Sequence, residues 1–127
     1  MELEGASVLV TGGASGIGEA CARRLSLLGA RPVIADLNEE KGKAVADDLK
    51  GPFAKTDVAD AHQAQAAVEA ALALGPLRAV VNAAGLGNAN RTGNREGVPF
   101  PLDQFEFVIR VNLIGTFNCL RLGAAAM

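Results

Sequence analysis

Short apolar runs alternate with longer amphipathic stretches along most of the chain. The apolar runs predict strands, at residues 7–10, 32–35, 52–55 and 77–81. The stretches between them carry apolar residues at helical spacing, and they end at Gly29, Gly51 and Gly75. Strands that alternate with helices pair in parallel through right-handed crossovers, with helices on both faces of the sheet. The pattern therefore predicts an α/β fold built on a doubly wound parallel sheet.

The last third of the chain departs from this alternation. Residues 87–101 form a polar loop without periodicity, long enough to be a functional loop or an insertion. From Asp103 to Met127 the sequence predicts one helix with two apolar stripes. One stripe consists of Phe105, Val108, Ile109, Leu113, Phe117 and Leu120, and the other of Phe107, Val111 and Ile114. We expect one stripe to rest on the sheet and the other to contact a second copy, which predicts a homo-oligomer through the 103–127 helix.

A glycine-rich turn joins the first strand to the first helix, with the sequence Thr-Gly-Gly-Ala-Ser-Gly-Ile-Gly at residues 11–18. Such a turn lets backbone N–H groups approach a diphosphate and places that anion at the positive end of a helix. Asp36 ends the second strand, 18 residues beyond Gly18. This spacing is close to the one at which a carboxylate meets the adenosine ribose. Together these features predict dinucleotide binding, and a purely structural tight turn is the alternative.

Three motifs, in this order, resemble the short-chain dehydrogenase/reductase family. They are Thr-Gly-x-x-x-Gly-x-Gly at residues 11–18, Asn-Ala-Ala-Gly at residues 82–85, and Asn112 in the last helix. The resemblance implies a Rossmann-type sheet whose first four strands have the order 3-2-1-4. It also implies NAD(P)-linked oxidation of an alcohol or reduction of a carbonyl. Within the family, residues 101–118 and the length of the preceding loop are most similar to the type 2 3-hydroxyacyl-CoA dehydrogenases.

The family pattern also implies roles for individual residues. Around the diphosphate and its ribose it places Gly12, Ser15, Gly16, Ile17 and Gly18. Asp36 and Leu37 fall at the adenosine ribose, and Asp57 and Val58 at adenine. The residues that fall close to the nicotinamide ribose are Asn82, Ala83, Ala84 and Gly85. For Thr11 the pattern implies a structural link from the first turn to strand four. For Asn112 it implies a catalytic role, in which the side chain holds a water in the proton relay.

Two of these assignments have a structural alternative. Asp57 could instead be a turn or helix-capping residue. Asn112 could be a polar residue on a helix surface. We expect it instead to be buried and hydrogen-bonded, because Ile109, Leu113 and Thr116 fall on the inward face of the helix. We expect His62, Arg91 and Arg95 to be solvated and to have no chemical role.

Composition and charge indicate which partners, metal sites and cell compartment to expect. Twelve basic and fourteen acidic residues give a net charge of −2, so the chain has no nucleic-acid footprint. No apolar run approaches the roughly 20 residues needed to span a bilayer, which predicts that it has no membrane partner. The two cysteines are far apart and only one histidine is present, so we expect reduced core cysteines and no metal site. With an acidic start, these features predict a cytoplasmic protein.

The chain contains no tyrosine. In the family, a Tyr-x-x-x-Lys helix and a serine, all after strand five, carry the proton transfer. Residues 1–127 are therefore predicted to be the NAD-binding N-terminal part of a single Rossmann-type domain, truncated before strand five and inactive alone. Asp36 favours NAD over NADP, and the implied substrate is an alcohol, a ketone or an acyl-CoA. The alternatives are a non-catalytic NAD-binding module and a structural fragment whose binding turn is empty.

Overall fold

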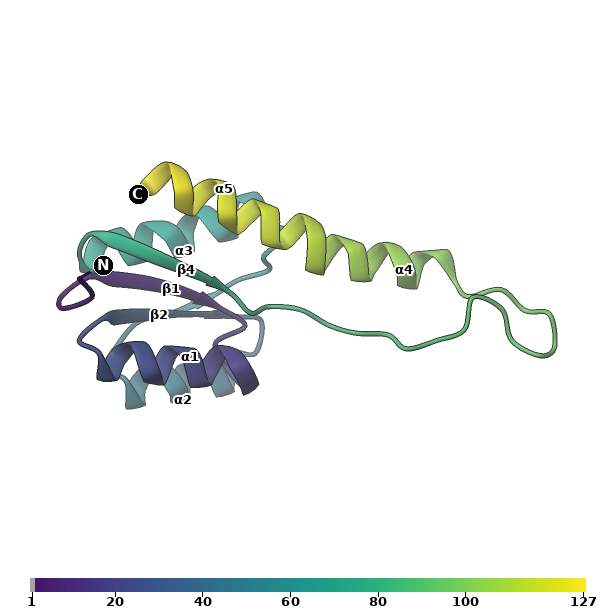
Figure 1. The fold of residues 1–127 in the computed structure, drawn as a ribbon, viewed down its shortest axis with the longest axis horizontal. Helices are drawn as coiled ribbons and strands as arrows, with labels where there is room; N and C mark the ends of the chain where they lie inside the picture. Colours follow the sequence, from purple (N-terminus) through teal and green to yellow (C-terminus); the bar gives the residue numbers. More distant parts are fainter. Residues whose placement is uncertain (1) are drawn as a thin grey trace.

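The computed structural model describes residues 2–127. Four parallel strands form one sheet in the order β3-β2-β1-β4 (Figure 1). These strands are β1 (Ser7–Thr11), β2 (Arg31–Asp36), β3 (Phe53–Lys55) and β4 (Leu77–Asn82). The structure confirms the predicted fold class and the predicted strand order.

Three helices connect the strands, and their ends follow the predicted signals. They are α1 (Gly16–Leu27), α2 (Glu39–Asp48) and α3 (Ala61–Leu74). Asn38 caps α2 by accepting the Lys41 N–H at 3.0 Å. Asp60 caps α3, with Oδ1 accepting the N–H groups of His62 and Gln63 at 2.9 Å each. Side-chain caps of this kind satisfy donors that the first helical turn leaves unpaired.

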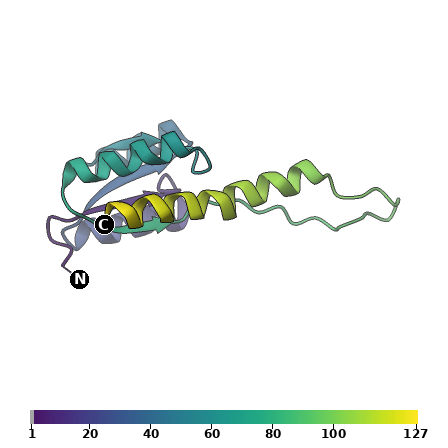
Figure 2. The ribbon, with the colours of Figure 1, turned by 90° about the horizontal axis from the view of Figure 1, so that it is seen from above.

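Helices cover both faces of the sheet, with α1 and α2 on one side and α3 on the other (Figures 1 and 2). Side chains along a strand point alternately to the two faces, so each strand supplies two cores. The core on the α1 and α2 side includes Val8, Val10, Ala22, Ile34, Val45 and Ala46. The core on the α3 side includes Leu9, Val33, Ala35, Ala67, Val68 and Ala71. This burial fixes the position of the carboxyl ends of the strands.

The last third of the chain forms one long helix with three segments, α4 (Leu102–Ile109), η1 (Arg110–Gly115) and α5 (Thr116–Ala126). The middle segment is a π-helix, which the periodicity did not predict. α5 packs on β4 and α3, whereas α4 and the loop before it project beyond the sheet (Figures 1 and 2). The predicted helix at residues 103–127 is therefore confirmed in extent.

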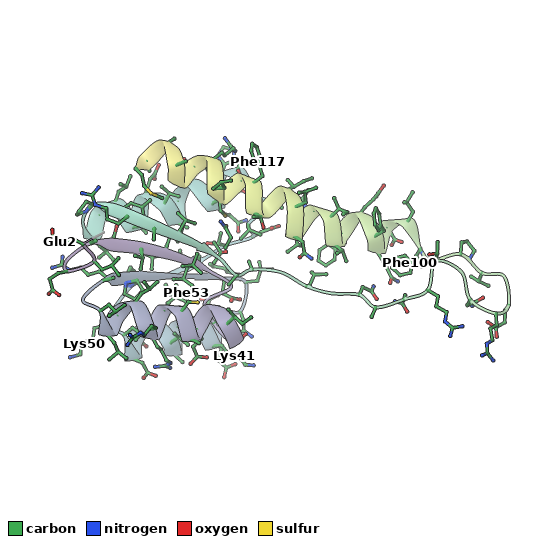
Figure 3. All side chains as sticks on the ribbon, viewed as in Figure 1. Glu2, Lys41, Lys50, Phe53, Phe100 and Phe117 are labelled. Carbon is green, nitrogen blue, oxygen red and sulfur yellow. The ribbon has the colours of Figure 1, made fainter. Side chains whose placement is uncertain are left out.

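The expectation that one of the two apolar stripes rests on the sheet is wrong, because most of both stripes is exposed in the single chain. Phe105, Leu113, Phe117 and Leu120 of the first stripe are each more than half exposed. Figure 3 shows Phe117 pointing away from the sheet, whereas Phe53 lies between the sheet and its covering helices. Of the second stripe, Phe107 and Ile114 are exposed, and Val111 packs against the core.

A third face of the long helix, which includes several small residues, contacts β4 and the turn after β3 instead. A Cβ on Gly115 would overlap the Val58 side chain, and one on Gly123 would overlap that of Val80. Cys119 lies between them and is buried, which raises the pKa of its thiol to about 11 because burial disfavours the thiolate. Close approach of the helix to the sheet thus selects small side chains, a feature that apolar periodicity does not reveal.

The loop between β4 and α4 carries little regular structure. One isolated antiparallel bridge joins Gly93 to Pro99, and Arg91 and Arg95 are exposed there as expected. Within residues 2–127, no helix combines the length and the apolar character needed to cross a membrane.

Candidate functional site

A cavity of about 430 Å³ opens at the carboxyl edge of the sheet. This volume lies within the range of small-molecule and cofactor sites. Its walls include all the residues predicted to meet the dinucleotide except Asn82, namely Gly12, Ser15, Gly16, Ile17, Gly18, Asp36, Leu37, Asp57, Val58, Ala83, Ala84 and Gly85. Asn82 ends β4 with its side chain exposed, outside the lining. The fold therefore brings four separate sequence segments to one cavity.

Three glycines of the first turn, Gly12, Gly16 and Gly18, are required by the local geometry. Gly12 has φ +65°, and a Cβ there would lie 2.6 Å from the backbone nitrogen of Ala84. A Cβ on Gly18 would overlap the carbonyl oxygen of Gly12. Gly16 has φ +56°, yet its Cβ would meet no described atom within 4 Å, because it borders the cavity. Gly12 and Gly18 thus allow close packing, and Gly12 and Gly16 allow the left-handed backbone.

The N-terminus of α1 has backbone donors free for a ligand. Ser15 is its N-cap residue and makes no side-chain capping bond to any described residue. The Glu19 N–H is bonded to the Ser15 carbonyl at 3.2 Å, so the donors before it lie ahead of the helical ladder. These are the N–H groups of Gly16, Ile17 and Gly18, all at the cavity. Such donors at the positive end of a helix fit a diphosphate.

Thr11 links the first turn to β4. Its hydroxyl donates to the Val81 carbonyl at 3.3 Å and accepts the Ala84 N–H at 3.3 Å. The Ala83 N–H donates to the Thr11 carbonyl at 3.2 Å. Thr11 is almost fully buried, so these bonds satisfy groups that water does not reach. These contacts show the structural role that the resemblance implies for Thr11, which is to link the first turn to β4.

The carboxylate of Asp36 is held by two backbone N–H groups. Oδ2 accepts from Ala14 at 3.0 Å, and Oδ1 accepts from Asn38 at 2.9 Å. β2 ends beside the glycine turn because Ala35 pairs with Thr11 in the sheet register. Leu37, which follows, is mostly exposed at the cavity. The arrangement presents an oriented negative group beside the donors of α1.

Asp57 has a structural role as well as a place at the cavity. Its Oδ1 accepts the Ala59 N–H at 2.9 Å, so the interpretation of Asp57 as a turn residue is correct for one of its oxygens.

Asp60 caps α3 close to this turn. Its pKa is lowered chiefly because its carboxylate accepts the Gln63 N–H. The positive charge of Arg110 lowers this pKa further.

Asn112 lies in the π segment and is exposed, so its predicted burial is wrong. The reason is that this part of the helix extends past the sheet edge, where Leu113 is also exposed. The amide is nevertheless fully engaged, since Oδ1 accepts the Leu86 N–H at 2.9 Å and Nδ2 donates to the Leu86 carbonyl at 2.7 Å. π segments occur frequently at functional sites. Here the segment ties Asn112 to the chain just after Gly85, at the edge of the cavity.

Five residues of the cavity wall escaped the sequence analysis, namely Thr56, Leu86, Phe107, Arg110 and Val111. Thr56 and Leu86 each adjoin a predicted residue. The other three follow helical spacing, with Arg110 and Val111 three and four residues after Phe107. That spacing, combined with the adjacent Asn112, is the signal that could have identified this wall.

A family model described as short chain dehydrogenase matches residues 6–127. The chain belongs to the short-chain dehydrogenase family. This confirms the resemblance read from the three motifs. The described part of this short-chain dehydrogenase, residues 2–127, holds no group of three or more His, Cys, Asp and Glu side chains placed to bind a metal ion.

Named relatives and a solved structure refine the comparison. The chain is 42% identical to a 3-hydroxyacyl-CoA dehydrogenase type-2 of Drosophila melanogaster, covering 98% of this chain and 51% of the relative. It is 38% identical to a mitochondrial borneol dehydrogenase of Lavandula x intermedia, covering 98% and 48%. The crystal structure of 3-hydroxyacyl-CoA dehydrogenase type-2 from Mycobacterium avium matches with a TM-score of 0.90 and 48% identity, covering 98% and 49%. This short-chain dehydrogenase thus spans about half the length of these proteins.

Substitution of three glycines by alanine tests the geometry of the first turn. Gly87→Ala is the control, because a Cβ there meets nothing within 4 Å and the backbone is not left-handed. Gly16→Ala should cost about 1–2 kcal/mol of unfolding free energy through its positive φ alone. Gly18→Ala should cost more, since the Gly12 carbonyl must move. Denaturant titration of the three variants measures this order, and equal stability of Gly18→Ala and Gly87→Ala would contradict the turn geometry.

Proposed function

We propose that the chain forms the NAD-binding part of a dehydrogenase that oxidises an alcohol or a 3-hydroxyacyl thioester, or reduces the corresponding carbonyl. The observation that carries this proposal is the composition of one cavity wall. The unpaired N–H groups at the start of α1, the carboxylate of Asp36 and the backbone of residues 83–85 all face the same space. Membership of the short-chain dehydrogenase family supports the oxidoreductase chemistry.

The proposed cofactor is NAD rather than NADP. Asp36 would accept from the ribose hydroxyls, whereas a 2′-phosphate would meet its negative charge. At about 4 Å and an effective dielectric of about 20, such a repulsion is about 4 kcal/mol per unit charge before screening. No Arg or Lys lies in the turn at residues 11–18 to offset it. The basic residue of the lining, Arg110, belongs instead to the long helix, and its charge acts on Asp60.

Bound NAD would supply the hydride acceptor for oxidation, or the donor in its reduced form. The part of the chemistry proposed for this chain is to hold the nicotinamide end near residues 83–86 and to support the proton relay through Asn112. The Ser, Tyr and Lys of the family pattern are not among these 127 residues. The absence of tyrosine in this chain is the observation that favours the alternative, a non-catalytic NAD-binding module.

A second copy is the proposed partner of the long helix. The stripe of Phe105, Leu113, Phe117 and Leu120 is exposed along one helix that projects from the body. Exposed apolar patches of this extent mark interaction sites. The apolar character of the stripe supports burial against an equivalent helix, as expected for a homo-oligomer.

Titration of Asp36→Asn with NAD and NADP tests the cofactor. The unmodified protein, in the full length its gene encodes, should bind NAD about 100-fold more tightly than NADP, an electrostatic preference reduced by salt. The variant should lose most of this preference. Asp47→Asn, an exposed carboxylate on α2, is the matched control and should retain it. Equal binding of both cofactors by the unmodified protein would disprove the proposed specificity.

Kinetics of Asn112→Ala test the proton relay. In the full-length protein this change should lower kcat by about tenfold or more, because it weakens a proton transfer of the kind that contributes about 10²–10⁴-fold to catalysis. The dissociation constant for NAD should change less than kcat, because Asn112 contacts Leu86 rather than the cavity. Asn90→Ala in the exposed loop serves as the control. A variant with unchanged kcat would refute the relay role, and an unmodified protein that binds NAD without turnover would favour the module.

Light scattering of Phe117→Glu tests the proposed assembly. A charge in the middle of the stripe should shift the protein toward a smaller mass, because burying an unpaired carboxylate opposes association. Leu28→Glu places the same charge on an exposed apolar side chain of the body and should leave the mass unchanged. A Phe117→Glu variant with the mass of the unmodified protein would show that this stripe does not hold copies together.

A further inference from the structure

Asn118 is a buried polar residue in α5, with 5% of its surface exposed. Its Nδ2 donates to the Val58 carbonyl at 2.8 Å and, more weakly, to the Asp60 carbonyl at 3.4 Å. Its Oδ1 accepts two bonds from Arg121, at 3.1 Å from Nε and 2.8 Å from Nη2. The side chain of Asn118 therefore joins the long helix to the turn between β3 and α3.

This turn needs a donor from outside. The Asp60 N–H donates to the Asp57 carbonyl at 3.0 Å, and the Ala59 N–H donates to the Asp57 carboxylate at 2.9 Å. The N–H groups of Ala59 and Asp60, which follow Val58, are thus directed to Asp57 and not to the Val58 carbonyl. A buried carbonyl without a partner costs free energy, so the fold must pair it. Asn118 Nδ2 pairs with the Val58 carbonyl through a buried hydrogen bond.

Arg121 fixes which way the Asn118 amide faces. A guanidinium only donates hydrogen bonds, so the oxygen of the amide must face it. The nitrogen of the amide must then face the two carbonyls of the turn. Gly115, one turn earlier, brings the helix against the Val58 side chain without a Cβ between them. The main chain and the side chain of Val58 are therefore both held by the long helix.

We propose that Asn118 is a positioning residue for the adenine end of the cofactor cavity. Asp57 and Val58 are the cavity residues that the proposed function places at adenine, and Asn118 sets the orientation of the peptide that joins their turn to the helix. Asn118 itself does not line the cavity. Its bonds to the Val58 and Asp60 carbonyls both fall on the turn at the adenine end of the cavity, so we expect its effect to be confined to that end of the dinucleotide. This inference rests on the proposed NAD site.

Asn118→Asp tests the role with little change in shape. The carboxylate keeps an acceptor for Arg121 but turns an oxygen toward the Val58 and Asp60 carbonyls. The full-length protein is loaded with NADH, and AMP and nicotinamide mononucleotide, the two halves of the cofactor, each displace it. The variant should bind AMP about tenfold more weakly, the effect of one buried unpaired group. Its affinity for nicotinamide mononucleotide should stay within about twofold.

A matched control separates positioning from general stability. Val45→Ala removes core volume beneath α2, on the opposite face of the sheet, and should lower the melting temperature without changing the ratio of the two affinities. Arg121→Leu is the second variant, because Arg121 is exposed and its loss does not threaten folding. Arg121→Leu should weaken AMP binding by about threefold. If Asn118→Asp does not fold, the AMP affinity of Arg121→Leu tests the positioning role in its place.

The outcomes distinguish this role from the proposed function. Selective loss of AMP binding in either variant supports positioning of the adenine end. An unchanged ratio, or an equal loss for both half-molecules, overturns it and leaves the NAD site standing. An unmodified protein that binds neither NADH nor AMP defeats the proposed function, and this inference with it.

Discussion

The carboxyl ends of β1 and β4 approach each other so closely at Gly12 that a Cβ there would lie 2.6 Å from the Ala84 nitrogen. This contact determines the rest of the site. It brings the Thr11 hydroxyl within reach of β4, so that one side chain bonds both strands. It also turns the chain sharply enough for α1 to begin at the sheet edge with its N–H groups toward the cavity. A side chain at Gly12 would separate the strands and displace each of these groups at once.

The long helix closes the cavity from the other side, and it depends on the same principle of close approach. Gly115 lies against Val58, which also borders the cavity, and Asn118 bonds the carbonyl of that residue. The π segment between α4 and α5 holds Asn112, whose amide bonds the backbone of Leu86. The helix is therefore joined to the strand ends at two loops by asparagine side chains. These polar links and the apolar packing of Val111 and Cys119 in the cluster around Val58 together hold the helix at the cavity.

Most of the strands could be predicted because parallel strands buried on both faces leave a clear apolar pattern, whereas their order was implied by the family resemblance. The position of Asp36 could be predicted too, since a residue that ends a strand lies at the binding edge. The long helix was harder. Its contact face consists of small and polar residues such as Gly115, Asn118 and Gly123, and apolar periodicity points to other faces. The π segment depends on tertiary contacts of Asn112, which leave no mark in local spacing.

The caps of the three crossover helices show how function and stability are balanced here. α2 and α3 each have a side chain that accepts N–H groups of the first turn, from Asn38 and Asp60. α1 has Ser15 at the equivalent position without such a bond to any residue in 2–127. A helix without such a cap lacks about 1 kcal/mol of the free energy of unfolding that a cap contributes. A diphosphate at the N-terminus of α1 would accept those same N–H groups, and a ligand that binds only the folded chain stabilises it. Binding of such a ligand would therefore be coupled to the stability of α1 at one set of backbone donors, which would give the missing cap of this helix a physical reason.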